Sequence, residues 1–127
     1  MEYRIEDATC PLWGSVVAAG NDCTVTVHGG SAPHIGSVVL AVPRPSLTGV
    51  GTSATVSCLN RTGHMDDVVA VAVAKRVASI RGGAVACSCG IHIDNASPEI
   101  IAHIASLGDQ VANEVVRLLQ EGEGTHE

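Results

Sequence analysis

The sequence predicts an α+β domain: a mainly antiparallel sheet of about five strands with two helices packed on one face. Two observations support this prediction. Four short segments rich in β-branched residues come first, separated by turns that contain glycine or proline. Two longer segments with helical spacing follow, with one more short apolar segment between them, which gives the order ββββαβα. The length suits one domain over residues 1–127, in which about 121–127 form a flexible tail.

The first two strands are predicted as a β-hairpin. Residues 12–18 are apolar and β-branched, residues 20–22 (Gly-Asn-Asp) are a turn signal, and residues 23–28 alternate between polar and apolar side chains. Residues 37–42 then predict a buried strand. Residues 54–59 predict a fourth strand, which follows a loop rich in Gly, Ser and Thr.

The first helix is predicted from about residue 64 to Arg81, where Gly82 and Gly83 end it. Its core face is predicted from apolar residues about one turn apart: Val69, Val73, Val77 and Ile80. Residues 84–89 predict a fifth strand. Because strand, helix and strand form a crossover connection, we expect this strand to pair parallel with a neighbour.

The second helix has a clear start, because Ser97, Pro98 and Glu99 suit the N-cap and the first two helical positions. It is predicted to run to about Gln120. A heptad-like seam follows its length, formed by Ile101, Ile104, Gly108, Val111, Val115 and Leu118. Glycine in such a seam permits a close approach to another backbone.

The composition predicts a core without large anchors. Hydrophobic residues make up 46% of the chain, but aromatic residues only 2%. The core must therefore pack Val, Ile, Leu and Ala through many small contacts. Burial of a helix face against a second copy would add such contacts, so we expect a homo-oligomer.

Charge and composition exclude several classes of function. The net charge is −6 and the seven basic residues are scattered, which argues against binding to nucleic acid. The apolar runs are too short to span a bilayer, and the first residues contain no apolar signal region. We therefore expect a cytoplasmic protein with no membrane partner. The five cysteines, an odd number, fit reduced thiols, and Cys87-x-Cys89 would place two of them on one face of a strand as small buried hydrophobes.

Four histidines are predicted at the ends of elements and close to glycine: His28, His34, His64 and His92. Loops at strand ends commonly carry the site of a sheet protein. A loop that only reverses the chain needs no histidine, yet residues 28–36 read His-Gly-Gly-Ser-Ala-Pro-His-Ile-Gly. The candidate ligand-binding residues of this loop are therefore His28, Gly29, Gly30, His34 and Gly36.

Residues 90–95, Gly-Ile-His-Ile-Asp-Asn, are the most informative segment. In an extended chain His92 and Asp94 share a face, where they could hold a divalent metal or form a proton-handling pair. Alternatively, Asp94 or Asn95 only supports the turn into the second helix. We take Gly90, His92 and Asn95 as candidates for ligand binding.

Residues 64–67, His-Met-Asp-Asp, open the first helix. Helix capping and compensation of the helix dipole would by themselves explain both aspartates. His64 is a further candidate ligand-binding residue, because free N–H groups at the two helix starts attract phosphate or carboxylate. A speculative metal site would combine four of these side chains: His64, Asp67, His92 and Asp94.

Three segments in this order, His28–Ser37, His64–Asp67 and Gly90–Ala96, resemble the small accessory D subunit of gallate-type hydroxyarylic acid decarboxylases. This is the prenylated-flavin chaperone-like family, and the resemblance covers roughly residues 12–119. It implies a non-enzymatic helper that assists maturation of prenylated FMN or its delivery to a partner decarboxylase. Prenylated FMN or FMN would be the cofactor, and a flavin prenyltransferase a further partner.

Two other functions remain open from the residues themselves. One is a small metal-dependent enzyme that uses the His/Asp site, with His28 or His34 handling protons. The other is a non-catalytic scaffold that self-associates through the seam between Ile101 and Leu118. The site hypotheses share one geometric expectation, that folding gathers His28, His34, His64, His92 and Asp94 around one cavity.

Overall fold

A computed structural model describes residues 1–61 and 66–124. The elements in chain order are β1 (Glu2–Ile5), β2 (Leu12–Ala19), β3 (Asp22–Gly30), β4 (Ser37–Pro45), β5 (Thr52–Asn60), α1 (Asp67–Arg81), β6 (Val85–His92) and α2 (Pro98–Gly124). The α+β class is confirmed, and the described residues form six strands where about five were predicted.

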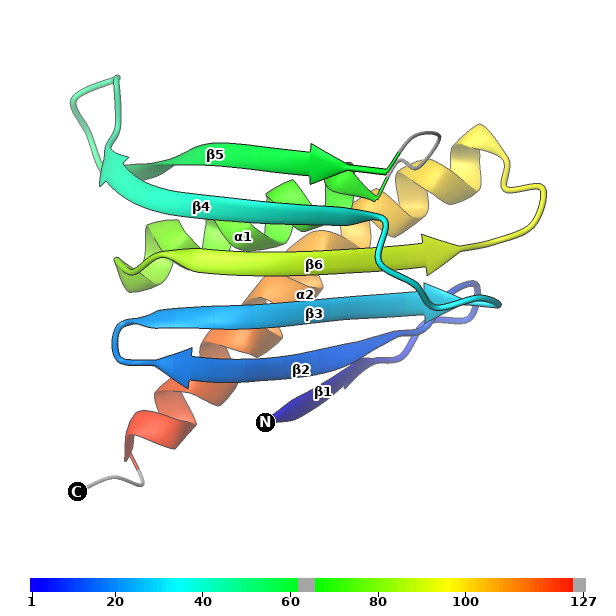
Figure 1. The fold of residues 1–127 in the computed structure, drawn as a ribbon, viewed down its shortest axis with the longest axis horizontal. Coiled ribbons are helices and arrows are strands. Elements are labelled where there is room, and N and C mark those ends of the chain that lie inside the picture. The colour runs from blue at the N-terminus through cyan, green and yellow to red at the C-terminus, as the bar shows by residue number, and fades with distance from the viewer. Residues whose placement is uncertain (62–65, 125–127) are drawn as a thin grey trace.

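The six strands form one mixed sheet in the order β1-β2-β3-β6-β4-β5, and both helices lie behind the same face (Figure 1). The predicted hairpin is β2–β3, which pairs antiparallel. β6 pairs parallel with β3, as the crossover predicts, and antiparallel with β4 on its other side. The sheet is therefore mainly antiparallel with one parallel pair.

The core lies between the sheet and the two helices. Alternate residues of every long strand point to the helices, among them Val25 and Val27 on β3, Val39 and Ala41 on β4, and Cys87 on β6, all with 0% exposure. Valine and alanine supply the facing side of α1. These buried residues confirm the expected aliphatic core. Their small side chains let the helices and the sheet approach closely.

Four details of the elements differ from the expectations. β1 was not predicted, because its four residues include the charged Glu2 and Arg4. Ile80 is 50% exposed and lies outside the core face of α1. α2 continues to Gly124, beyond the expected end at Gln120, and Arg81 pairs with Glu123 at 2.6 Å, which ties the last turn to the end of α1.

The seam of α2 packs inside the chain. Ile104, Val111 and Val115 are buried in the core, and Gly108 faces Ala72 of α1. This burial is the fourth difference from the expectations. The seam offers no surface for self-association between two copies, except at its ends, Ile101 and Leu118. Among the described residues, no helix is long and apolar enough to cross a membrane.

Candidate functional site

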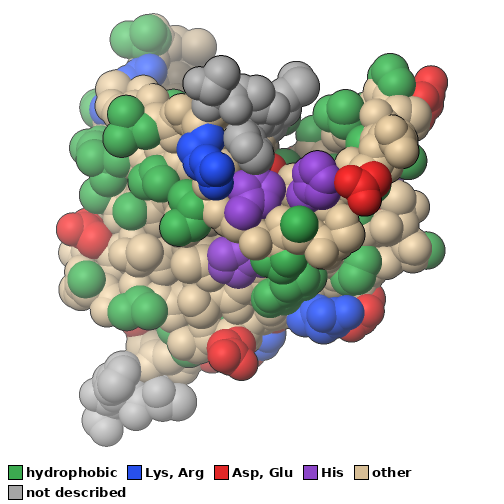
Figure 2. Space-filling view, turned by 45° about the vertical axis from the view of Figure 1, so that its right-hand side comes forward, with side chains coloured by type: hydrophobic (Ala, Val, Ile, Leu, Met, Phe, Trp, Pro, Cys, Tyr) green, Lys and Arg blue, Asp and Glu red, His purple; other side chains and the backbone are tan. Residues whose placement is uncertain are grey.

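The described parts of the three segments that the sequence marks out lie at one end of the sheet: residues 28–37, Asp66 and Asp67, and residues 90–96. β3 and β6 run parallel, and β5 runs the same way because β4 is antiparallel to both β5 and β6. The C-terminal ends of these three strands therefore share one edge, at the right of Figure 1. Figure 2 shows histidine side chains gathered at this end, next to a basic and an acidic side chain.

Asp66 is the central polar group of this end, and its carboxylate turns to the sheet rather than to its own helix. It makes no side-chain cap on α1, so the capping interpretation is wrong for this residue. One carboxylate oxygen accepts the backbone N–H of Ile91 at 2.9 Å. The other lies 3.2 Å from Nε2 of His34. Asp66, only 6% exposed, thus joins the start of α1 to β6 and to the loop before β4.

The imidazole of His34 lies between two oxygen acceptors. Its Nδ1 is 2.9 Å from the carbonyl oxygen of Ala32, and its Nε2 faces the Asp66 carboxylate. His34 is only partly exposed and therefore presents one edge to solvent.

The glycines of the predicted loops are explained by close approaches within the chain. A Cβ on Gly36 would overlap the Asp66 carboxylate, and a Cβ on Gly90 would overlap the carbonyl group of His34. Gly29 packs against Leu12, and Gly30, at φ 77°, against the carbonyl of His92. Atoms of this chain thus fill the space over these four residues, so the absence of a side chain there needs no ligand to explain it.

His92 forms a second, more exposed polar pair. Its Nε2 lies 2.8 Å from a carboxylate oxygen of Asp94, and its backbone carbonyl accepts the N–H of Ser31. Asn95 follows with φ 55°, so it forms a left-handed turn before α2. Both residues of the pair are open to solvent, at 47% and 77% exposure of the side chains.

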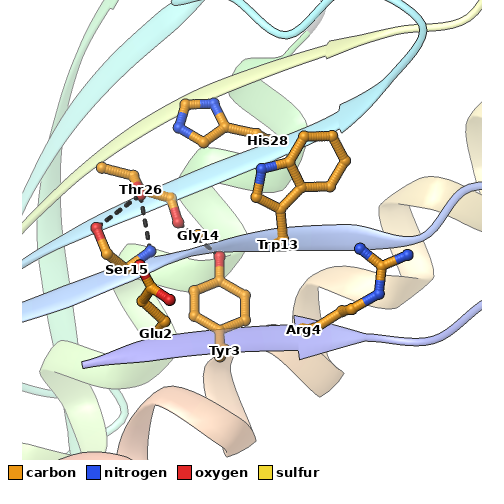
Figure 3. A pocket seen from close by; sticks show the side chains of 8 residues that line it. All are labelled: Glu2, Tyr3, Arg4, Trp13, Gly14, Ser15, Thr26 and His28. Carbon is orange, nitrogen blue, oxygen red and sulfur yellow. Dashed lines mark hydrogen bonds between the residues drawn. The ribbon is translucent and has the colours of Figure 1, made fainter.

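His28 does not share the environment of these two pairs. It lies on the sheet face away from the helices, opposite Trp13 on β2, with the two ring centroids 6.4 Å apart. Figure 3 shows both rings beside a hollow of about 660 Å³ that also reaches Arg4 and Thr26. Nδ1 of His28 is buried and has no hydrogen-bond partner among the described residues. The single cavity that was expected is therefore not formed, because His28 lines one hollow and His92 lines another.

An apolar cavity of about 200 Å³ lies next to Asp66 and His92. It is enclosed by the start of α1, the end of β6 and the start of α2. Its aliphatic walls are supplied by Val68, Val69, Ile91, Ile93, Ile101 and Ile104. The cavity combines a hydrophobic interior with two polar groups at its margin, which is the usual composition of a small-ligand site.

The predicted metal ligands are only partly described. His64 lies outside the described residues, and Asp67 is the first residue of α1. Among residues 1–61 and 66–124, no group of three or more His, Cys, Asp or Glu side chains is arranged to hold a metal ion. His92 and Asp94 are the two predicted ligands in direct contact.

Several residues of this end were not singled out from the sequence. Arg61 at the end of β5 is the basic residue of the site, and its guanidinium donates to the carbonyl of Ile35 at 3.2 Å. Val68 and Ile101 are large apolar side chains at the cavity, both more than a third exposed, and Ile101 had been considered only as part of the α2 seam. For Val68 the available signal was an apolar residue on a helix outside the core stripe, next to a polar segment.

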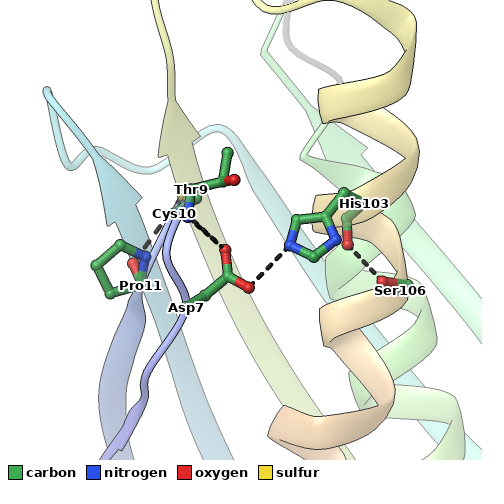
Figure 4. A network of polar contacts seen from close by, with 6 residues as sticks. All are labelled: Asp7, Thr9, Cys10, Pro11, His103 and Ser106. Carbon is green, nitrogen blue, oxygen red and sulfur yellow. Dashed lines mark hydrogen bonds and ion pairs between the residues drawn. The ribbon is translucent and has the colours of Figure 1, made fainter.

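A separate polar network joins the segment that connects β1 and β2 to helix α2. Asp7 accepts the backbone N–H groups of Thr9 and Cys10, and its other oxygen lies 2.8 Å from Nε2 of His103 (Figure 4). The N–H of Cys10, followed by the contact with His103, holds the pKa of Asp7 below its ordinary value. His103 therefore ties α2 to the loop after β1.

The two cysteines of β6 are structural. Cys87 and Cys89 are both fully buried on the core face. Burial raises the pKa of Cys87 to about 12, and burial also raises that of Cys89. Since the thiolate is the reactive form, neither is a nucleophile near neutral pH.

Comparison with known proteins adds a family and a fold. Residues 6–120 match the model of the prenylated flavin chaperone LpdD-like domain. The chain is 27% identical over 120 residues to Protein LpdD of Lactiplantibacillus plantarum (strain ATCC BAA-793 / NCIMB 8826 / WCFS1), which covers 93% of this chain and 84% of that protein.

A solved structure, a novel chaperone complex for yeast 20S proteasome assembly, contains a chain of similar fold. The TM-score is 0.53, the identity 11%, and the match covers 95% of this chain and 94% of that one. At this identity the likeness concerns the arrangement of strands and helices alone.

Proposed function

This chain belongs to the family of prenylated flavin chaperone LpdD-like domains, and from that premise we propose that it holds prenylated FMN during maturation or delivery to a partner decarboxylase. It would act in the cytoplasm, where its five free cysteines stay reduced. The observation that carries the proposal is the apolar cavity beside Asp66 and His92. Its aliphatic walls suit the hydrocarbon that prenylation adds to a flavin.

The polar groups of the same end suit the rest of such a ligand. Asp66 and His92 border the cavity, and His34 is paired to Asp66. Arg61 directly follows β5 at the same end of the sheet, and the N-terminus of α2, the positive end of its helix dipole, lies beside the cavity. A basic side chain and a helix start together favour a phosphate at the margin of the cavity.

The size of the cavity supports a carrier role over catalysis. At about 200 Å³ it is smaller than the roughly 300–1,000 Å³ of sites that enclose a whole small ligand. It would hold one apolar part of the cofactor and leave the remainder accessible to a partner protein. Partial enclosure favours release, which delivery requires.

The proposal is tested by anaerobic titration of the full chain with prenylated FMN and, separately, with FMN. We expect prenylated FMN to bind more tightly. Ile101→Asn should weaken its binding roughly tenfold, because loss of about 1.4 kcal/mol of apolar contact corresponds to that factor. Ile80→Asn is the matched control, since Ile80 is an isoleucine of comparable exposure on α1 (50%, against 40% for Ile101) that does not line the cavity.

Native mass spectrometry of the same samples reports the bound species. Retention of the flavin by the wild type and by Ile80→Asn, with loss in Ile101→Asn, would support the carrier role. Equal binding by all three proteins, or none by the wild type, would contradict it. Stoichiometric retention of a divalent ion, lost in His92→Ala, would favour the metal-dependent alternative instead.

A further inference from the structure

The sheet face opposite the helices is not covered by a helix and carries a row of exposed aliphatic side chains along β4. Both helices pack on one face, so the outward side chains of the other meet no further layer (Figure 1). On β4 these are Val38, Leu40 and Val42, each between 41% and 47% exposed, and Leu59 of β5 adjoins them at 77%. Hydrophobic side chains are spread over this face, which is turned to the left in Figure 2.

The middle of this face carries no Asp, Glu, Lys or Arg. The outward positions in the middle of the three central strands are Thr24, Thr26 and His28 on β3, Ala86 and Ser88 on β6, and Val38, Leu40 and Val42 on β4, while Asp22 lies at the first position of β3 and the carbonyl of His34 covers Gly90. Charged side chains begin at the margins, with Glu2 and Arg4 on β1 and Arg44 near the end of β4. In a chain of net charge −6, this is a surface where a second copy could approach without placing carboxylates together.

The relief of the face is self-complementary. Large side chains form a ridge along β4, and small ones leave a groove along the neighbouring β6. Leu40 pairs in register with Ala86, and Val38 with Ser88. A two-fold axis parallel to the strands, midway between β4 and β6, therefore sets the ridge of each copy over the groove of the other.

We propose that this face is the interface of a homodimer in which two sheets stack about that axis. Leu40 of one protomer would lie over Ala86 of the partner subunit, and Val38 over Ser88 of the partner subunit. Large residues over small ones let two sheets interdigitate at the usual separation of about 10 Å. An isologous contact of this kind closes on itself and stops at two copies.

The area of the overlap suits a dimer of moderate affinity. About this axis β3, β6, β4 and β5 of the two copies overlap, and four strands about 4.8 Å apart with 8 or 9 residues each give roughly 550 Å². This is near the lower end of the roughly 600–1,000 Å² per partner that stable interfaces bury. The proposal does not depend on the proposed function, because the apolar cavity is lined by α1 and α2 on the other side of the sheet.

Sedimentation equilibrium of the full chain tests the proposal. The wild type should be a dimer at micromolar concentration. Leu40→Lys should raise the dimer dissociation constant by roughly 100-fold or more, since the charge is placed in the centre of the interface twice. Ile80→Lys is the matched control, because Ile80 is similarly exposed but lies on α1. It should leave the dissociation constant unchanged.

A pair of variants tests the register directly. Ala86→Glu should also give monomers, while an equimolar mixture of the L40K and A86E chains should form a heterodimer, in which one introduced charge meets its opposite. Circular dichroism of each variant identifies any loss of fold. A monomeric wild type, a dimer that survives both substitutions, or a mixture that stays monomeric would overturn the proposal.

Discussion

Gly36 shows how tightly the candidate site is built at the scale of single residues. A Cβ at this position would overlap a carboxylate oxygen of Asp66. Gly36→Ala should therefore lower the free energy of unfolding by about 1–3 kcal/mol, as overpacking does in buried regions. Urea denaturation measures this. Gly122→Ala is the control, because its Cβ would lie 3.5 Å from Met1 at an ordinary contact distance.

A double variant separates this clash from other effects of the extra methyl group. In Gly36→Ala/Asp66→Ala the overlapping carboxylate is gone. The losses of unfolding free energy in the two single variants should therefore sum to more than the loss in the double variant. Strictly additive losses would mean that Asp66 is not the group that excludes a side chain at position 36.

Asp7 makes a pH-dependent contribution to stability. The N–H of Cys10 and the contact with His103 lower its pKa below 3.8 in the folded state. The carboxylate therefore stabilises the fold fully above that value, and the stabilisation is lost as the pH falls through the lower, folded-state pKa. Asp7→Asn should be less stable than the wild type near pH 7, and the difference should shrink in acid.

Urea denaturation between pH 7 and pH 2 checks this course for Asp7→Asn. Asp109→Asn, an exposed position on α2, controls for the loss of one negative charge. A difference between Asp7→Asn and the wild type that grows as the pH falls would contradict the assigned sign.

The site was predictable in place but not in detail at this scale. Histidine beside glycine at strand ends placed His34 and His92 at one edge of the sheet, where the structure has them. The partner of His34 was not predictable, because Asp66 in the sequence also satisfies the ordinary pattern of a helix cap. Only the packing of α1 against the end of β6 turns that carboxylate to the sheet.

At the scale of elements, the contact between α1 and α2 depends on Gly108. A Cβ there would lie 3.4 Å from that of Ala72, so Gly108→Ala should be tolerated and gain up to about 1 kcal/mol of helix propensity. Gly108→Leu should overpack the helix pair and cost about 1–3 kcal/mol. Thermal and urea unfolding measure both. Equal stability of Gly108→Leu and Gln110→Leu, an exposed control, would contradict the close approach.

Periodicity identified the elements better than their partners. The hairpin, the start of α2 and the parallel pairing of β6 followed from turn residues, a capping residue and the crossover rule. The role of the α2 seam did not follow, since a heptad-like stripe is the same whether its partner is another copy or α1. A single 127-residue chain also cannot reveal from its sequence which helix covers which strands.

At the scale of the whole molecule, two surfaces have different neighbours. The candidate site lies at one end of the sheet and toward the helices, whereas the open face lies on the opposite side. The two-layer architecture explains why both exist, because helices on one face leave the other to solvent or to a partner. Residues 37–42 were predicted as a buried strand because they are almost continuously apolar, but Val38, Leu40 and Val42 on β4 face away from the core and are 41–47% exposed.

The proposed dimer has a characteristic response to salt. The centre of the interface carries no Asp, Glu, Lys or Arg, while each protomer carries a net charge of −6. Added salt should therefore screen repulsion between protomers without weakening ion pairs between them. Raising NaCl from 20 to 200 mM should lower the dissociation constant a few-fold, which sedimentation equilibrium measures. A dissociation constant that rises over this range would mean that charged pairs hold the copies together, and that another surface forms the contact.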